Sequence, residues 1–260
     1  MKNYITSKSW ITLYGIFFCL FLSSGVWGQV VTYDWLNNAP DGYWKQGDAG
    51  ARWNPGGLWD QPGYGVLRFN NNHQLSMINN VSGIYDQHRI IFGDQNTNER
   101  IINGGTLKLS DFSGSNPLIQ NFSNSNHTLN SVIEVGSGGT WNFDIIASHG
   151  SLTFGGAFTH NTSKIIFLQG NNSGVSSIRT INLNGIISGN GSIHIVNDAM
   201  VRYGAIQSYT GTTEIIKGEL IVNPTADITG SLINIGSVSN TTSIAKFFLG
   251  ASNGNQIFSR

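Results

Sequence analysis

Residues Tyr209–Val222 have the sequence YTGTTEIIKGELIV, which contains two short runs of strand-forming residues, Thr212–Ile216 and Glu219–Val222. Lys217 and Gly218 separate the two runs. β-Branched residues favour strands, and glycine adopts the backbone conformations that sharp turns need. Neither run is long enough to bury a core alone. We therefore expect both to pair with strands from elsewhere in the chain, with Gly218 at the turn between them.

A local pattern recurs along the chain: a glycine, one polar residue, then apolar residues at alternate positions. Copies begin at Gly105, Gly139, Gly150, Gly191 and Gly218. The stretch after Gly230 departs from the pattern, because Asn234 stands where the second apolar residue is expected. Such alternation predicts strands with one face in a core and one in water. The irregular spacing predicts a stack in which each turn of the chain carries several short strands.

Composition supports an all-β fold. The 260 residues include 33 Gly, 14 Phe, 8 Tyr and 7 Trp, and only 11% are charged. A chain with this much apolar surface and this little charge is expected to fold. No stretch after residue 28 shows a sustained helical period of apolar residues. The predicted strands include Arg89–Phe92, Ser131–Val135, Lys164–Leu168, Ser177–Leu183 and Ser192–Val196.

Two all-β architectures compete. Four Asn-Gly pairs, which are typical of hairpin turns, favour a β-sandwich. The short strands, with turn residues at each end, favour a parallel β-helix whose successive coils share an interior. We favour the β-helix and keep the β-sandwich as the alternative. In the β-helix, Ile, Val and Leu would fill the interior, and Asn and Thr on the flanks would form stacked hydrogen-bonded ladders.

The first 28 residues have the features of a cleavable export signal. Lys2 and Lys8 precede the apolar stretch Ile11–Leu22, and small residues lie before Gln29. The apolar stretch is shorter than the roughly 20 residues that span a bilayer. Cys19, the single cysteine, lies within it. We expect the mature chain to have no disulfide and no membrane span. It would meet the export machinery and reach the extracellular or outer-membrane surface of a bacterium.

The opening stretch resembles the autotransporter-associated β-strand repeat, also called the passenger-associated transport repeat. That repeat has a Tyr-x-Gly-x-Thr stretch followed by Gly-x-Leu-x-Leu or Val. Residues 185–195, GIISGNGSIHI, resemble the glycine-rich strand that commonly precedes it. The resemblance covers about residues 185–222. It implies coils of a right-handed parallel β-helix in a large exported surface protein. The residues that carry it are Tyr209, Gly211, Thr213, Gly218, Leu220 and Val222.

The tryptophan-rich segment 29–69 resembles the amino-terminal region of such proteins. Here the order is Trp53-Asn54, whereas Asn-Trp is usual there. The expected organisation is a signal at 1–28, a cap or first coil at 29–69 and coils over 70–260. No carboxy-terminal translocation or sorting domain is visible, so we expect the sequence to be the front part of a longer protein.

The tryptophans of this segment are the most prominent candidate site. Exposed aromatic rings stack on sugars, which would make them glycan contacts. Buried aromatic rings would instead cover the open end of the first coil. We favour the capping role. The residues concerned are Trp35, Trp44, Trp53 and Trp59.

Motifs for catalysis or metal binding are not evident in the sequence. The histidines show no His-x-x-x-His spacing, so we expect no zinc site and place each on the surface or in a turn. They are His73, His88, His127, His149, His160 and His194. The acidic residues are isolated, without the paired carboxylates of glycosidases. They include Asp86, Asp94, Glu99, Asp111, Glu134, Asp144 and Asp198.

Other ligand classes also lack a signature. There is no Gly-x-Ser-x-Gly elbow, no phosphate-binding Gly-Lys-Ser/Thr and no basic patch for nucleic acid. We expect no catalytic residue, cofactor or metal. The expected function is an exported structural or adhesive surface module that contacts glycans or other cells. The alternatives are a carbohydrate-active β-helix resembling a polysaccharide lyase and a glycan-binding β domain.

Overall fold

The computed structural model divides the chain into two units, Met1–Val30 and Val31–Arg260. The predicted export signal and Trp59 lie outside the residues that the structure describes. Those residues are 31–36, 43–44, 53–54, 65–72, 75–80, 85–93, 98–112, 114–136, 142–160, 164–169, 179–228, 230–236, 245–251 and 254–259.

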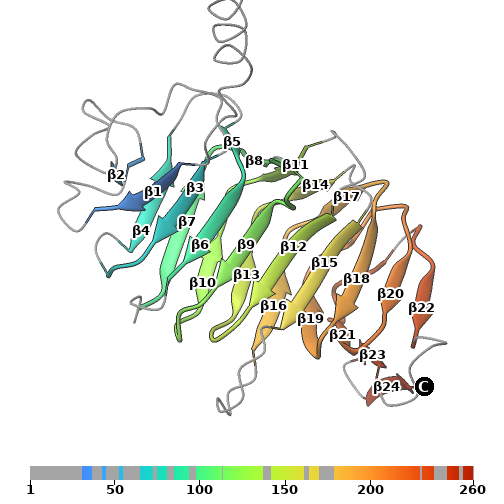
Figure 1. The fold of residues 1–260 in the computed structure, drawn as a ribbon. Helices are drawn as coiled ribbons and strands as arrows, with labels where there is room; N and C mark the ends of the chain where they lie inside the picture. The colour runs from blue at the N-terminus through green and yellow to red at the C-terminus, as the bar shows by residue number, and fades with distance from the viewer. Residues whose placement is uncertain are drawn as a thin grey trace, which may run out of the picture. The chain divides into compact units, whose positions relative to one another are not determined.

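The described residues form three β-sheets and no helix, which confirms the all-β prediction (Figure 1). Sheet A contains, in spatial order, β2 (Trp53–Asn54), β1 (Thr32–Trp35), β3 (Val66–Phe69), β6 (Arg89–Phe92), β9 (Leu118–Asn121), β12 (Asn142–Ala147), β15 (Lys164–Gln169), β18 (Ser192–Val196), β20 (Thr213–Ile215) and β22 (Ile233–Ile235). Sheet B contains β24 (Gly254–Ser259), β23 (Ala245–Ala251), β21 (Gly218–Val222), β19 (Ala199–Tyr203), β16 (Thr180–Leu183), β13 (Leu152–Phe154), β10 (His127–Leu129), β7 (Arg100–Gly104) and β4 (Ser76–Asn79). Sheet C contains β17 (Ile187–Gly189), β14 (Phe158–His160), β11 (Ile133–Val135), β8 (Leu107–Leu109) and β5 (Tyr85–Gln87).

The chain visits the three sheets in turn. From β3 to β16, each strand pairs in parallel with the third strand further along the chain, as β6 does with β9 and β7 does with β10. We call one passage through sheets A, B and C a circuit. Among the described strands, antiparallel pairing occurs only between β1 and β2 and between β23 and β24. Parallel pairing throughout the middle does not fit the β-sandwich alternative, whose strands would be joined by antiparallel hairpins.

The circuits differ in length. Side-chain contacts between neighbouring circuits join residues 20 positions apart at Ser192 and Thr212, but 29 apart at Thr153 and Asn182. After β17, sheet C is continued by an isolated bridge between Gln207 and Ile228. The later circuits are therefore shorter, because the third strand is reduced to one residue.

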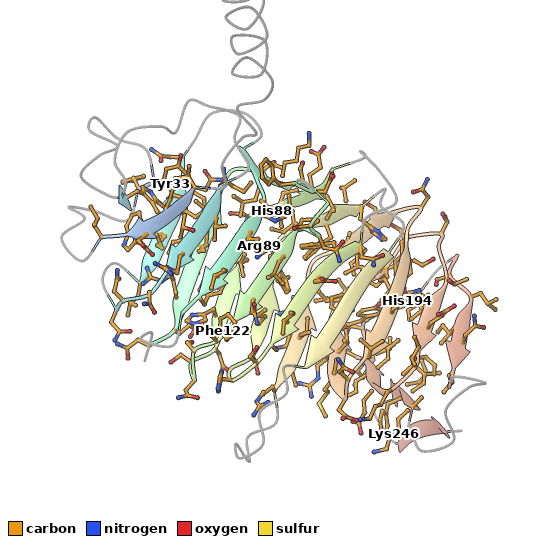
Figure 2. All side chains as sticks on the ribbon, in the orientation of Figure 1. Tyr33, His88, Arg89, Phe122, His194 and Lys246 are labelled. Atoms are coloured by element: carbon orange, nitrogen blue, oxygen red, sulfur yellow. The ribbon has the colours of Figure 1, made fainter. Side chains whose placement is uncertain are left out.

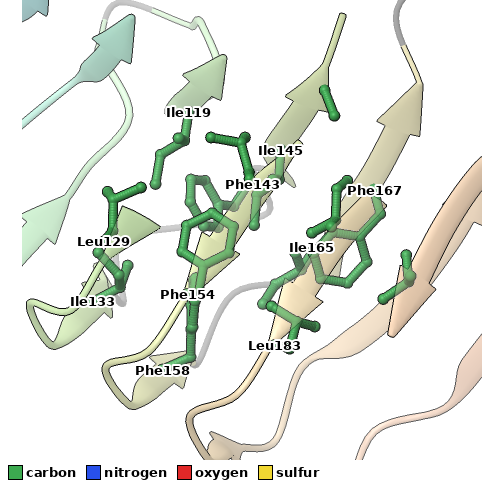
Figure 3. Packing of buried hydrophobic residues seen from close by; sticks show 14 of the residues in the cluster. Ile119, Leu129, Ile133, Phe143, Ile145, Phe154, Phe158, Ile165, Phe167 and Leu183 are labelled. Atoms are coloured by element: carbon green, nitrogen blue, oxygen red, sulfur yellow. The ribbon is translucent and has the colours of Figure 1, made fainter. Parts of the chain in front are cut away.

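The hydrophobic core lies between the sheets. Inward positions alternate with outward ones, as in β12, where Phe143, Ile145 and Ala147 are buried and the residues between them are half-buried. Aromatic rings interdigitate across sheets, and the Phe154 and Phe158 ring centroids are 4.9 Å apart (Figure 3). Burying one such side chain stabilises a fold by roughly 1.5–3 kcal/mol. The short strands are thus stabilised by apolar side chains that are buried only when several circuits pack together.

The predicted strands match the structure closely at Arg89–Phe92 and Ser192–Val196. The Gly-polar-apolar pattern forms strands in all three sheets: β8 in sheet C, β18 in sheet A and β13 in sheet B. The expected polar contacts also occur, as pairs between neighbouring circuits. Examples are Asn130 Nδ2 to Asn103 Oδ1 at 2.8 Å and Asn182 Nδ2 to Thr153 Oγ1 at 3.2 Å.

None of the described residues forms a helix long and apolar enough to cross a membrane.

Candidate functional site

Three tryptophans lie together at the β1–β2 end of sheet A. Trp35 ends β1 and pairs with Trp53 at the start of β2, while Trp44 follows a bridge between Tyr43 and Ile78. The ring centroids of Trp35 and Trp53 are 5.0 Å apart at 82°, and those of Trp44 and Trp53 are 5.8 Å apart at 88°. Edge-to-face contacts of this kind are favourable for aromatic pairs. We call these residues the tryptophan layer.

The tryptophan layer covers the first aromatic residue of the core. The Trp53 ring lies 5.4 Å from the Phe69 ring, which in turn stacks on Phe92 at 5.6 Å. Trp44 and Trp53 are fully buried, and Trp35 is 2% exposed. Their ring faces are therefore not open to a sugar, and this burial supports the capping interpretation for these three residues. Trp59, the fourth, is outside the described part of the chain.

A buried cation connects the tryptophan layer to the next circuits. Arg100, the first residue of β7, has no exposed surface, and its guanidinium carbon lies 5.2 Å from the Phe69 ring centroid. Its Nη2 donates to the Asn71 carbonyl oxygen at 2.6 Å, and its Nη1 lies 3.0 Å from Met77 Sδ. Burial lowers the pKa of Arg100 to about 10, so the group is still charged at neutral pH. Its contacts indicate a structural role.

A serine and a histidine approach each other closely in the interior. Ser123 Oγ lies 2.6 Å from His127 Nε2, and both residues are fully buried. The Arg100 backbone N–H donates to His127 Nδ1 at 3.0 Å, so Nδ1 carries the lone pair and Nε2 carries the proton. His127 therefore donates to Ser123 and does not accept its proton. This arrangement does not activate the serine as a nucleophile, since that requires the imidazole to act as the base.

The repeat motif forms a buried hydroxyl network. The Tyr209 hydroxyl contacts the Tyr203 hydroxyl at 3.2 Å and forms a short hydrogen bond with Thr213 Oγ1. Thr213 Oγ1 also lies 2.9 Å from Ser231 Oγ, which donates to the Gly211 carbonyl oxygen at 2.6 Å. Tyr203, Tyr209 and Thr213 are fully buried. The Tyr and Thr of the motif thus bind successive circuits together.

The glycines of the motif permit close approach between circuits. A Cβ on Gly211 would lie 2.1 Å from the Gly191 carbonyl oxygen, well inside van der Waals contact. Gly218 has a φ of +141°, and a Cβ there would lie 2.4 Å from the Ala199 carbonyl oxygen. The chain bends at residues 216–217, so Gly218 begins β21 and does not itself form the turn. Leu220 and Val222 point into the core from this strand.

A second buried imidazole lies beside this network. His160 ends β14 and is fully buried, and its ring centroid is 6.1 Å from that of Tyr209. Gly189, its register partner in β17, has a φ of +117°, and a Cβ there would lie 1.8 Å from the His160 carbonyl oxygen. Neither ring nitrogen of His160 has a hydrogen-bond partner in the structure. Burial lowers the pKa of His160 to about 4.

The expectation that each histidine lies on the surface or in a turn is wrong for two of them. His127 and His160 are not exposed at all, whereas His88 is 2% exposed but lies at the bend between β5 and β6. His127 and His160 occupy inward positions of short strands, which single histidines in a polar sequence do not reveal. His194 does lie on the outer face of sheet A, with its Nδ1 3.3 Å from a Glu214 oxygen (Figure 2). His73 is outside the described residues.

One acidic residue that is isolated in sequence gains partners in the fold. Asp144, on the outward side of β12, accepts a hydrogen bond from Asn116 Nδ2 at 3.2 Å. Burial raises its pKa, while Asn116 and the positive charge of Arg89 oppose the rise. Arg89 belongs to a strand two positions away in sheet A and bonds His88 Nε2 at 3.0 Å (Figure 2). Sequence spacing could not place these groups together, because unequal circuits separate them.

Metal ligands do not gather in the described ranges, where no group of three or more His, Cys, Asp or Glu could hold an ion. Comparisons with protein-family models, curated proteins and solved structures found no significant match to the chain.

Proposed function

We propose that the protein is an exported right-handed parallel β-helix that acts as a structural or adhesive module on a bacterial surface. The strand order of the three sheets supports this architecture, because parallel partners recur once in each circuit. The tryptophan layer at one end is what a capped stack of circuits requires.

The main support for the proposal comes from the contacts that the motif residues make. Tyr209, Gly211, Thr213 and Gly218 all contact neighbouring circuits, and Tyr209, Thr213 and Gly218 are buried. The motif therefore serves assembly of the stack, as the resemblance to the autotransporter-associated repeat implies. The outward residues Thr128, Thr153 and Asn182 of sheet B would offer neutral polar groups for weak, multivalent contacts with glycans.

Export and adhesion are tested separately. Amino-terminal sequencing of the protein recovered outside the expressing bacterium should begin at Gln29, and an intact residue 1 would contradict the export proposal.

For adhesion, protein coupled at high density to beads should bind glycan-coated or cell surfaces more strongly than free protein does. Equal binding by both forms would contradict the multivalent mechanism, and tight saturable binding of free protein to one sugar would favour a glycan-binding domain.

A carbohydrate-active β-helix is the second candidate, and Asp144 is the observation that favours it. A half-buried carboxyl with a raised pKa, near an arginine, is the type of group that acid–base catalysis uses. Incubation with uronide polysaccharides and calcium should give no new reducing ends or unsaturated products if the structural proposal is right. Turnover that Asp144→Asn abolishes would overturn it in favour of the enzyme.

A further inference from the structure

The outer face of sheet A carries two rows of half-buried side chains that run across β6, β9 and β12. The rows are aligned because both neighbours of β9 pair with it in parallel register. One row has charged residues at its ends and an apolar residue between them, and the other has an amide between two apolar residues. The rows are Arg89, Leu118 and Asp144, and Ile91, Gln120 and Ile146.

An exposed aromatic ring continues this face just beyond the end of β9. Phe122 is 40% exposed, although phenylalanine is usually buried. Its N–H donates to the Phe92 carbonyl at 2.8 Å, and the Ser148 N–H donates to the Asn121 carbonyl at 2.9 Å, so the register continues by one residue. Its neighbours in the adjacent circuits are therefore Gly93 and Ser148, both buried. Neither carries a large side chain, and the ring is accessible from the surface.

At the opposite end of the face, one hydrogen bond orients the Arg89 guanidinium (Figure 2). His88 Nδ1 lies 3.1 Å from the Ser110 carbonyl oxygen, to which it can only donate. The lone pair of the neutral ring is therefore on Nε2, which accepts from Arg89 Nε at 3.0 Å. No described residue accepts a hydrogen bond from Nη1 or Nη2 of Arg89. These donors remain available to a ligand.

Acceptor oxygens lie on the same face. Asn116 Nδ2 donates to Asp144 Oδ2 at 3.2 Å, and no described residue donates to Asp144 Oδ1. Gln120 donates from Nε2 to Ser148 Oγ at 3.3 Å, while its Oε1 has no donor among the described residues. The face thus combines hydrogen-bond donors on β6, acceptors on β9 and β12, and an aromatic ring.

This combination suits a neutral sugar chain. Sugar hydroxyls both donate and accept hydrogen bonds, and the C–H face of a sugar ring packs on aromatic side chains. An anion attracted by Arg89 would also meet the Asp144 carboxylate, and a cation would meet the guanidinium, so the opposite charges favour a ligand without net charge. From Leu118 to Phe122 the face extends over four residue steps, about 13 Å. That length exceeds one sugar ring.

We infer that the outer face of β6, β9 and β12 binds a neutral oligosaccharide that lies along β9. One sugar ring packs on Phe122, and the hydroxyls of another bond to Arg89 and Asp144. The inference rests on the proposed adhesive function and assigns it a defined contact site on sheet A. One such site in each copy gives weak binding, which many copies on a surface would strengthen. No covalent step is involved.

The test is ligand-observed NMR of the purified protein with neutral cello-, xylo-, manno- and chito-oligosaccharides, and with acidic oligogalacturonate for comparison. At least one neutral chain should bind, and more tightly than oligogalacturonate does. Phe122→Leu removes the ring, and Arg89→Gln removes the guanidinium; each should weaken binding about tenfold. Phe122→Tyr, which keeps a ring, should retain binding. Tyr43→Leu is the matched control, because Tyr43 is equally exposed but bridges to Ile78 in sheet B.

Unchanged urea midpoints will show that the variants are folded. If one does not fold, deuterating the phenylalanines of the parent should still reduce saturation transfer from the protein to the sugar. No binding by the parent, tighter binding of oligogalacturonate, no effect of deuteration, or equal weakening by Tyr43→Leu would each overturn the inference.

The bead assay separates this site from the adhesive function itself. Beads that carry the Phe122→Leu and Arg89→Gln proteins should adhere less than parent beads. Equal adhesion would overturn the site on sheet A and leave the adhesive function standing. Parent beads that adhere to no glycan or cell surface would refute both.

Discussion

Two of the buried imidazoles, those of His127 and His160, predict that acid destabilises this fold strongly. His127 accepts a hydrogen bond from the Arg100 backbone at Nδ1, so protonation would break that bond and place a second positive charge near the buried guanidinium. Burial, followed by the charge of Arg100, lowers the pKa of His127 to about 3. Burial alone lowers the pKa of His160 to about 4. In the unfolded chain both groups have a pKa of about 6.5.

The sign of the effect follows from these pKa values. Below pH 6.5 these two histidines become protonated in the unfolded chain but stay neutral in the folded chain. The free energy of unfolding therefore falls as the pH falls. The stabilisation is fully present above pH 6.5 and is lost progressively toward pH 3–4. Between pH 7.5 and 4.5, each histidine accounts for a loss of roughly 2.5 kcal/mol, and the two together for about 5 kcal/mol.

The assay is urea unfolding at pH 7.5 and at pH 4.5, monitored by tryptophan fluorescence, to which the tryptophan layer contributes. A double variant, His127→Gln and His160→Leu, keeps similar side-chain volumes but cannot take up these protons. Its free energy of unfolding should fall about 5 kcal/mol less than that of the parent between the two pH values. His194→Gln, on the outer face, is the matched control and should not reduce the loss. Equal acid sensitivity of the parent and the double variant would refute the reasoning.

Three further predictions concern the tryptophan layer and the repeat motif. Trp53→Ala should lower the free energy of unfolding by about 3–5 kcal/mol, because it empties a buried site; lost glycan binding with unchanged stability would contradict the capping role. Tyr209→Phe should cost roughly 1–3 kcal/mol in urea unfolding, because Thr213 loses its buried hydroxyl partner, and an unchanged midpoint would contradict the network. Gly211→Ala should cost about 1–3 kcal/mol, since its Cβ would lie 2.1 Å from the Gly191 carbonyl oxygen. A neutral effect in the same measurement would show that the circuits can separate easily.

Local strand structure was predictable from alternation. Arg89–Phe92 and Ser192–Val196 are strands at the predicted bounds, because alternate apolar residues leave few other ways to bury one face. The sheet to which each strand belongs was not predictable. Leu107–Leu109 and Leu152–Phe154 follow the same local pattern, yet they lie in sheets C and B. That assignment depends on loops of unequal length, which local pattern does not encode.

For the candidate site as well, some features were predictable from the sequence and others were not. The residues of the motif were identified from their spacing, but their roles emerged only from contacts with other circuits, such as Thr213 with Ser231. The burial of His127 and Arg100 was missed, because a polar residue in a short run gives no sign of which face it occupies. Asp144 and Arg89 were unrelated in sequence and became neighbours through sheet A.

The sequence by itself determined an all-β chain of short, half-buried strands and identified the motif in Tyr209–Val222. Alternation and turn residues act over a few positions, so they are visible without the fold. Only the tertiary structure decided which strands pair, that three tryptophans are buried and that His127 and His160 are neutral in the interior. Each of these depends on contacts between different strands, and circuits of unequal length remove any fixed period from which they could be inferred.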